Sequence, residues 1–189
     1  MRMPGKKPTL LFLALILLAS PLPGHTQKVD YNRSQITFIS RQMNVPVEAR
    51  FNRFTAQISF NAAKPETGKA AIDIDIGSFD ISNDEINAEI RKKEWFDTRN
   101  FPRATFVSTT VHALSGGRYE ARGPLTIKGR TNEIKAPFTV KTDAAGNSIF
   151  EGTFNIRRLQ YNIGEGIWKD TDLVADEIQI KFRLHTIGK

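Results

Sequence analysis

Strict alternation between apolar and polar residues constrains the fold of this chain more than any other feature of its sequence. In residues 69–79, KAAIDIDIGSF, three isoleucines fall on one face of an extended chain, while Asp73 and Asp75 fall on the other. The same period of two recurs, more or less regularly, over residues 34–43, 47–61, 103–114, 117–128, 132–141, 147–158 and 177–186. These eight segments predict eight β-strands, each with one apolar face.

Short connections rich in Gly, Asn and Asp separate several of these segments. They are SGG at 115–117, KGRTN at 128–132 and DAAGN at 143–147, and such residues favour tight antiparallel turns. The strands between residues 103 and 158 therefore form an up-and-down meander, with Lys128, Lys135 and Lys141 expected to face water. Eight antiparallel strands can close into a barrel without exposed edges, but a two-sheet sandwich satisfies the same periodicity.

Two segments break the alternation. Residues 82–96, SNDEINAEIRKKEWF, place Ile86 and Ile90 four apart, begin with capping residues and end with basic ones, which predicts a short amphipathic helix. This helix falls between the third and fourth predicted strands and could lie across one end of a barrel. Residues 160–176 form a glycine-containing loop between the last two strands.

Residues 1–26 are predicted to be a secretory signal peptide. A basic start, an apolar run from Leu10 to Ala19, and then prolines and small residues have that layout, with an uncleaved membrane anchor as the alternative. The apolar run is shorter than the roughly 20 residues that a spanning helix needs. Residues 27–189 are then expected to form one domain in a periplasmic or secreted location.

The charge and cysteine content exclude several classes of protein. The signal segment has three basic residues, so 24 Lys and Arg remain against 20 Asp and Glu, a net charge of +4. The basic residues are scattered and form no run with interleaved aromatics, so no nucleic-acid partner is expected. The excess could favour transient contact with an anionic membrane surface. The chain has no cysteine, which excludes disulfides, thiolate metal sites and a lipid-anchored N-terminus.

No constellation of reactive groups is evident in the sequence. Beyond the signal segment the two histidines, His112 and His185, lie on separate predicted strands, and no metalloprotease, nucleophile-elbow or nucleotide-binding motif occurs. The pair Asp170 and Asp172 lacks the further oxygen ligands of a calcium loop. We therefore expect no catalytic residues, metal or cofactor. The remaining candidate for a functional feature is the apolar inner face of the strands. An eight-stranded barrel can fill its interior with side chains or hold one small ligand there.

Three stretches of the chain carry a family resemblance. They are AEIRKKEWFDTRNFPRATFVST (88–109), YEARGPLTIKGRTNEIKAPFTV (119–140) and RRLQYNIGEGIWKDTDLVADEIQIKFRL (157–184). In this order they resemble the YceI-like family of lipocalin-like polyisoprenoid-binding proteins, over about Val29 to Leu184. The resemblance implies an all-β, eight-stranded antiparallel barrel with a short helix between strands three and four. It further implies an apolar tunnel, a periplasmic or secreted protein, and an isoprenoid or similar long-chain lipid as ligand, with no established catalysis.

On this reading the inner wall becomes the predicted lining of the tunnel. The lining candidates are Phe38, Phe54, Ile58, Ile74, Phe106, Leu125, Ile127, Phe138, Val140, Phe154 and Phe182. Candidates for the tunnel mouth are Arg91, Trp95, Arg158, Tyr161 and Trp168, with Arg91 as the contact for an anionic head group. One alternative is an enzyme or enzyme accessory acting on the same lipids through Asp97, Tyr161 and Glu165. Another is a solid barrel that serves as an interaction scaffold.

Overall fold

The chain folds into one curled antiparallel β-sheet. The computed structural model describes residues 26–188, so the predicted signal peptide lies outside the described residues except for Thr26. The strands are β1 (Lys28–Val29), β2 (Gln35–Gln42), β3 (Val45–Phe51), β4 (Phe54–Ser59), β5 (Lys69–Asp75), β6 (Phe79–Asp80), β7 (Arg103–Val107), β8 (Thr110–Ala113), β9 (Arg118–Ile127), β10 (Arg130–Thr142), β11 (Ser148–Arg157) and β12 (Glu177–Ile187). Five 3-10 turns connect them, at Pro65–Thr67, Ile76–Ser78, Ser115–Gly117, Arg158–Tyr161 and Gly166–Lys169.

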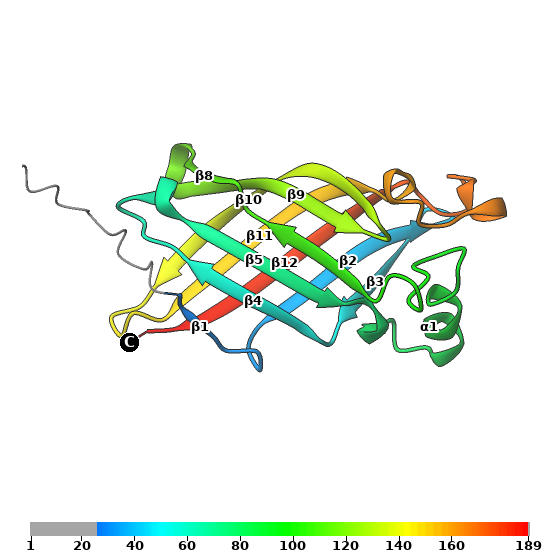
Figure 1. Cartoon of the computed structure of the whole chain (residues 1–189), viewed down its shortest axis with the longest axis horizontal. Helices are drawn as coiled ribbons and strands as arrows, with labels where there is room; N and C mark the ends of the chain where they lie inside the picture. Colours follow the sequence, from blue (N-terminus) through cyan, green and yellow to red (C-terminus); the bar gives the residue numbers. More distant parts are fainter. Residues whose placement is uncertain (1–25, 189) are drawn as a thin grey trace, which may run out of the picture.

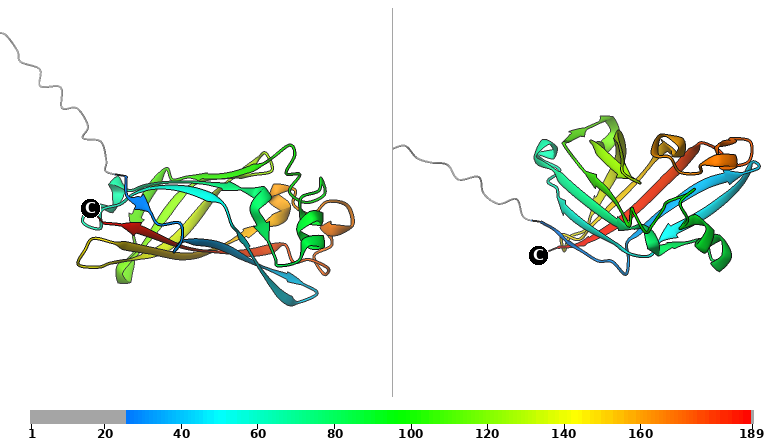
Figure 2. Two further views of the ribbon diagram at one scale, coloured as in Figure 1. Left: turned by 90° about the horizontal axis from the view of Figure 1, so that it is seen from below. Right: turned by 45° about the vertical axis from the view of Figure 1, so that its right-hand side comes forward.

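All strand pairs are antiparallel, and the strand order is β4-β5-β7-β9-β10-β11-β12-β2-β3-β6. The short β8 pairs with β9, and β1 pairs with β12. Figure 2 shows how this sheet curls round on itself. A bridge between Gln27, next to β1, and Ile58 of β4 joins the two sides of the sheet at one end. Because the strands belong to one continuous sheet, the lipocalin-like barrel prediction is confirmed and the two-sheet sandwich is wrong.

The prediction of eight strands is wrong in detail, because two predicted segments are each divided. Residues 47–61 become β3 and β4, which pair with different neighbours, and the break is held by Ser78, whose carbonyl accepts from the Asn52 N–H at 3.1 Å. Residues 103–114 become β7 and β8. Here the Ser108 hydroxyl accepts from the Ala70 N–H at 2.8 Å, a bond that interrupts the run. The two-residue strands β1 and β6 are too short to produce a detectable alternation.

The predicted helix is present between β6 and β7, but it is shorter than residues 82–96. Helix α1 spans Asp84–Ile90, and its N-cap side chain, Asn83, accepts from the Ile86 N–H at 3.1 Å. The chain after Ile90 turns instead of continuing, because the N–H groups of Lys92, Trp95 and Phe96 bond back to nearby carbonyls. Figure 1 shows α1 at the same end of the molecule as residues 158–176, opposite the end that carries the C-terminus.

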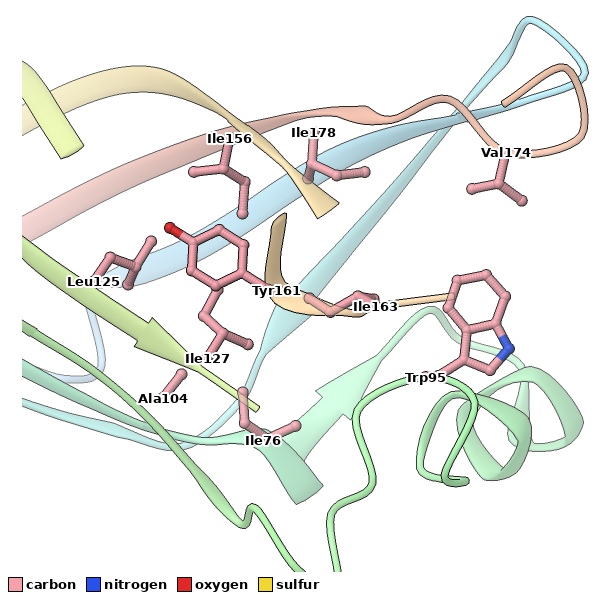
Figure 3. Close-up of a cluster of buried hydrophobic side chains, with 10 residues drawn as sticks. All are labelled: Ile76, Trp95, Ala104, Leu125, Ile127, Ile156, Tyr161, Ile163, Val174 and Ile178. Atoms are coloured by element: carbon pink, nitrogen blue, oxygen red, sulfur yellow. The ribbon is translucent and has the colours of Figure 1, made fainter. Parts of the chain in front are cut away.

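The inner face of the sheet carries two groups of buried apolar side chains. The first lies toward the α1 end and combines strand residues such as Leu125 and Ile127 with Trp95 and Tyr161 from the end segments (Figure 3). The second lies around Ile58, Phe150 and Leu184. Side chains of both groups line one internal cavity.

Candidate functional site

The curled sheet encloses an apolar cavity with a volume of about 240 Å³. Every long strand contributes to its wall, and α1 contributes Ile86 and Ile90. Among its 41 lining residues the polar ones are only Thr37, Ser40, Gln42, Ser59, Lys69 and Arg158. Such a wall has few hydrogen-bonding groups for a polar solute and favours an apolar ligand or ligand segment.

Nine of the eleven residues predicted to line a tunnel do line this cavity. They are Phe38, Ile58, Ile74, Phe106, Leu125, Ile127, Phe138, Phe154 and Phe182. Phe54 and Val140 do not line it. Both pack against the second core group, and Phe54 meets the Tyr31 ring edge-on at a centroid distance of 5.6 Å. The part that any of these residues plays in binding a ligand stays a prediction.

Several aromatic side chains of the wall were not among the predicted site residues. They are Phe51, Phe60, Phe79, Phe96 and Phe150. Phe60 packs against Phe138 and Phe150 with centroid distances of 5.6 and 5.7 Å, so the rings support one another. The alternation in 147–158 places Phe150 on the same face as Phe154 and could have identified it. Phe79 and Phe96 carry no such signal, since one lies in a two-residue strand and the other in an irregular segment.

The five predicted mouth residues do not share one environment. Trp95 and Arg158 line the cavity and are almost fully buried. Trp168 is half-buried and packs on Trp95 with a centroid distance of 5.3 Å, without lining the cavity. Tyr161 is 1 % exposed within the first core group and does not line the cavity either. Arg91 is exposed and donates to the Gly77 carbonyl at 3.2 Å, so the structure places it away from the cavity wall.

Two charged residues line the cavity, and of these Lys69 is exposed whereas Arg158 is buried. Arg158 is 1 % exposed, and its guanidinium donates to backbone carbonyls of the loop before β12. Those contacts are to Ile163 at 2.8 Å, Gly164 at 3.4 Å, Val174 at 2.6 Å and Ala175 at 3.0 Å. Burial lowers the pKa of Arg158, and the charge of Asp176 partly opposes that effect.

Lys128 provides a second buried cation at the α1 end, contrary to the prediction that it faces water. It sits in the β9–β10 turn with a positive φ of 47°, and its side chain is 5 % exposed. Its ammonium donates to the Lys93 carbonyl at 2.7 Å, to the Asn162 carbonyl at 2.8 Å and to a Glu165 carboxylate oxygen at 2.7 Å. Lys128 therefore ties the segment after α1 to the loop after β11, and its hydrogen bond and charge lower the pKa of Glu165.

Two buried polar atoms at this end make no hydrogen bond within residues 26–188. They are the indole Nε1 of Trp95 and the hydroxyl of Tyr161. Burial raises the pKa of Tyr161, while the nearby amide of Asn132 acts in the opposite direction without meeting ordinary hydrogen-bond geometry. Figure 3 shows the Tyr161 ring among the aliphatic side chains of Leu125, Ile127 and Ile156.

Of the three residues proposed for an enzymatic alternative, Asp97 and Glu165 have hydrogen-bond partners, whereas the Tyr161 hydroxyl has none within residues 26–188. Asp97 accepts from the Asn100 side chain at 2.9 Å, and Glu165 binds Lys128. Within residues 26–188, no group of three or more His, Cys, Asp or Glu side chains is placed to hold a metal ion. The absence of catalysis stays a prediction. No helix of the described chain is long and apolar enough to cross a membrane.

Fold and site together define a class of protein: a curled antiparallel sheet that encloses an apolar cavity and is covered at one end by a short helix and a loop. The chain belongs to the YceI-like family, because residues 27–186 match the YceI-like domain. This confirms the family resemblance seen in the sequence.

Relatives and solved structures agree with this assignment. A UPF0312 protein of Shewanella baltica is 32 % identical over 143 residues, which cover 72 % of this chain and 73 % of the relative. The crystal structure of BcnA from Burkholderia cenocepacia is 42 % identical, with a TM-score of 0.81 over 84 % of this chain and 99 % of that one. A polyisoprenoid binding domain from Saccharophagus degradans shares the fold at 19 % identity, with a TM-score of 0.70 over 87 % of this chain and all of that domain.

Proposed function

We propose that this protein binds an isoprenoid or similar long-chain amphiphilic lipid in its cavity and sequesters or shuttles it in the periplasm or another secreted location. The observation that carries the proposal is the cavity itself, whose wall is apolar apart from six residues. Membership of the YceI-like family and the shared fold with a polyisoprenoid binding domain support it.

The energetics favour an apolar tail in such a cavity. Removing one methylene group from water is worth about 0.8 kcal/mol, so a long tail gains more inside the sheet than in an aqueous compartment. Ordering of the tail and desolvation of its head group offset part of that gain. A lipid of this kind needs a carrier protein to cross an aqueous compartment. The proposed role is that of the carrier, without chemical conversion of the lipid.

Loading at a membrane surface is part of the proposal. Large apolar side chains are exposed in segments at the α1 end, namely Met43 and Val45 at the β2–β3 hairpin and Ile167 in the loop before β12. The Met43 N–H bonds to the Leu173 carbonyl at 3.0 Å, so the hairpin tip and this loop are neighbours. Flotation with phosphatidylethanolamine vesicles should recover the wild type, and replacing Met43 and Ile167 with Ser should reduce that recovery.

The test of the main proposal is mass spectrometry of lipids extracted from protein purified from its native compartment. We expect a stoichiometric, chemically unchanged long-chain lipid, and N-terminal sequencing of the same material should begin near Gln27. Ligand-free protein that also excludes an apolar dye would contradict the carrier role and favour a solid scaffold. Conversion of an added lipid, lost in Asp97→Asn, would favour the enzymatic alternative.

A further inference from the structure

Arg158 carries a buried charge at the cavity wall without a carboxylate partner in contact. The residue is 1 % exposed and lines the cavity, yet no carboxylate oxygen in residues 26–188 lies within ion-pair distance of its guanidinium. Asp176, whose charge acts on it, is instead bound to the Leu159 N–H at 2.9 Å. A cation removed from water is costly unless a counter-charge accompanies it.

The hydrogen bonds of Arg158 leave room for one more acceptor. A guanidinium has five N–H groups, and the four loop carbonyls occupy at most four of them. The contact to the Gly164 carbonyl, at 3.4 Å, is the longest of the four. Carbonyl dipoles stabilise the cation but do not neutralise it, so a ligand with a negative charge would complete both the charge balance and the hydrogen bonding.

Trp95 supplies an independent second donor. It is 6 % exposed and lines the same cavity, and its indole N–H has no partner within the described residues. An indole nitrogen can only donate, so the missing partner must be an acceptor. A buried donor without an acceptor costs about 1–3 kcal/mol of folding free energy, and a ligand that accepts from this N–H would remove that cost.

The two donors are brought to the same end of the cavity by the loop before β12. The Gly164 N–H bonds to the carbonyl of Glu94, the residue before Trp95, at 2.9 Å. The carbonyls of Ile163 and Gly164 accept from Arg158. Figure 3 shows Trp95 beside Ile163 and Val174, which are also residues that Arg158 contacts.

We propose that Arg158 and Trp95 form the head-group site of the cavity and select a long-chain ligand that ends in an anionic oxygen group, a carboxylate or a phosphate. Both residues donate and neither accepts, which matches an anionic oxygen group and disfavours an ammonium, which can only donate. This inference rests on the proposed lipid-binding function and deepens it. It also moves the predicted anion contact from the exposed Arg91 to the buried Arg158.

The experiment compares palmitate with methyl palmitate, which share a tail and differ in head-group charge. Each displaces an apolar fluorescent dye from the full-length mature protein, and the ratio of the two affinities is the readout. A charge-assisted hydrogen bond is roughly twice as strong as a neutral one, so we expect wild type to prefer palmitate by about tenfold. Dodecyl phosphate and dodecanol, compared in the same way, separate a phosphate from a carboxylate preference.

Three variants locate that preference. Trp95→Phe keeps a ring but removes the N–H, and should lower the ratio to about threefold. Trp168→Phe is the matched control, since Trp168 packs on Trp95 without lining the cavity, and should leave the ratio unchanged. Arg158→Gln should abolish the preference, and if it fails to fold, Trp95→Phe decides.

The outcomes separate this inference from the function on which it rests. Equal affinity of wild type for the charged and uncharged member of both pairs overturns the anionic head-group site while leaving lipid binding intact. A preference that survives both Trp95→Phe and Arg158→Gln also overturns it, because the head group then lies elsewhere. If no compound displaces the dye, or no dye binds, the lipid-binding function itself fails.

Discussion

Replacing Ala136 with Phe tests directly whether the sheet encloses usable space. Ala136 on β10 lies opposite Ala121 on β9 in the strand register, and both side chains are buried and line the cavity. Two positions along, the same inner face carries the larger Phe138. The paired alanines therefore leave space that a phenyl ring at position 136 would occupy.

The expected loss of lipid affinity depends on how much of the bound tail the ring displaces. If it excludes three methylene groups of a bound tail, at about 0.8 kcal/mol each, the affinity falls by about 2.4 kcal/mol, or about 50-fold. The folded state should not lose stability, because a ring that fills existing apolar space gains burial without displacing its neighbours. In a packed barrel the same ring would overfill the core and cost roughly 1–3 kcal/mol.

Dye displacement by a long-chain lipid measures the affinity, and urea unfolding measures the stability. Ala113→Phe is the matched control, since Ala113 lies exposed on β8 and the same chemical change there should alter neither quantity much. A variant at position 136 that binds lipid as the wild type does, but unfolds more easily by about 2 kcal/mol, would refute the hollow barrel.

Two further predictions concern charged groups at the α1 end. The Ser82 N–H, with smaller effects from neighbouring side chains, lowers the pKa of Asp80 from 3.8 to about 2. The carboxylate therefore stabilises the fold above about pH 3.8, and this contribution is lost as the pH falls toward 2. Asp80→Asn should accordingly lower the urea midpoint at pH 7 but match the wild type near pH 2; a difference that persists at pH 2 would contradict this assignment. Lys128→Met should cost about 2 kcal/mol in urea unfolding, less than a fully buried pair because Glu165 is partly exposed, and should raise the pKa of Glu165 in an NMR titration. An unchanged Glu165 pKa would show that the two side chains are not paired in solution.

The long strands could be predicted because their alternation has a local cause. Successive side chains of an extended chain point to opposite faces. A strand with one buried face therefore alternates apolar and polar residues. That is why the sequence alone predicts residues such as Phe106 and Phe182 on the inner face, where the structure has them lining the cavity. Phe54 and Val140 show the limit of the rule, because alternation specifies the face of a strand but not the position along the barrel.

The divided and the very short strands could not be predicted, because their causes lie far away in the chain. The break between β3 and β4 depends on Ser78, and the break between β7 and β8 depends on a bond from Ala70 to Ser108. Strand β1 is defined by its pairing with β12, and Gln27 before it bridges to Ile58 of β4. A local pattern of residues cannot predict hydrogen bonds between segments that are far apart in the chain.

By itself, the sequence determined an all-β chain with one apolar face per strand, a helix after the third predicted strand and an apolar wall, because each of these follows from local periodicity and capping. Only the tertiary structure decided which polar groups that wall contains. Lys128 and Arg158 are basic residues of the kind usually exposed, yet the fold buries both. The carbonyls of Lys93 and Asn162, distant in the chain, accept from Lys128, and carbonyls of the loop before β12 accept from Arg158. The loop before β12 also brings Arg158 to the end of the cavity where Trp95 lies. In this loop the Ile163 carbonyl accepts from Arg158, and the Gly164 N–H donates to the carbonyl of Glu94, the residue before Trp95.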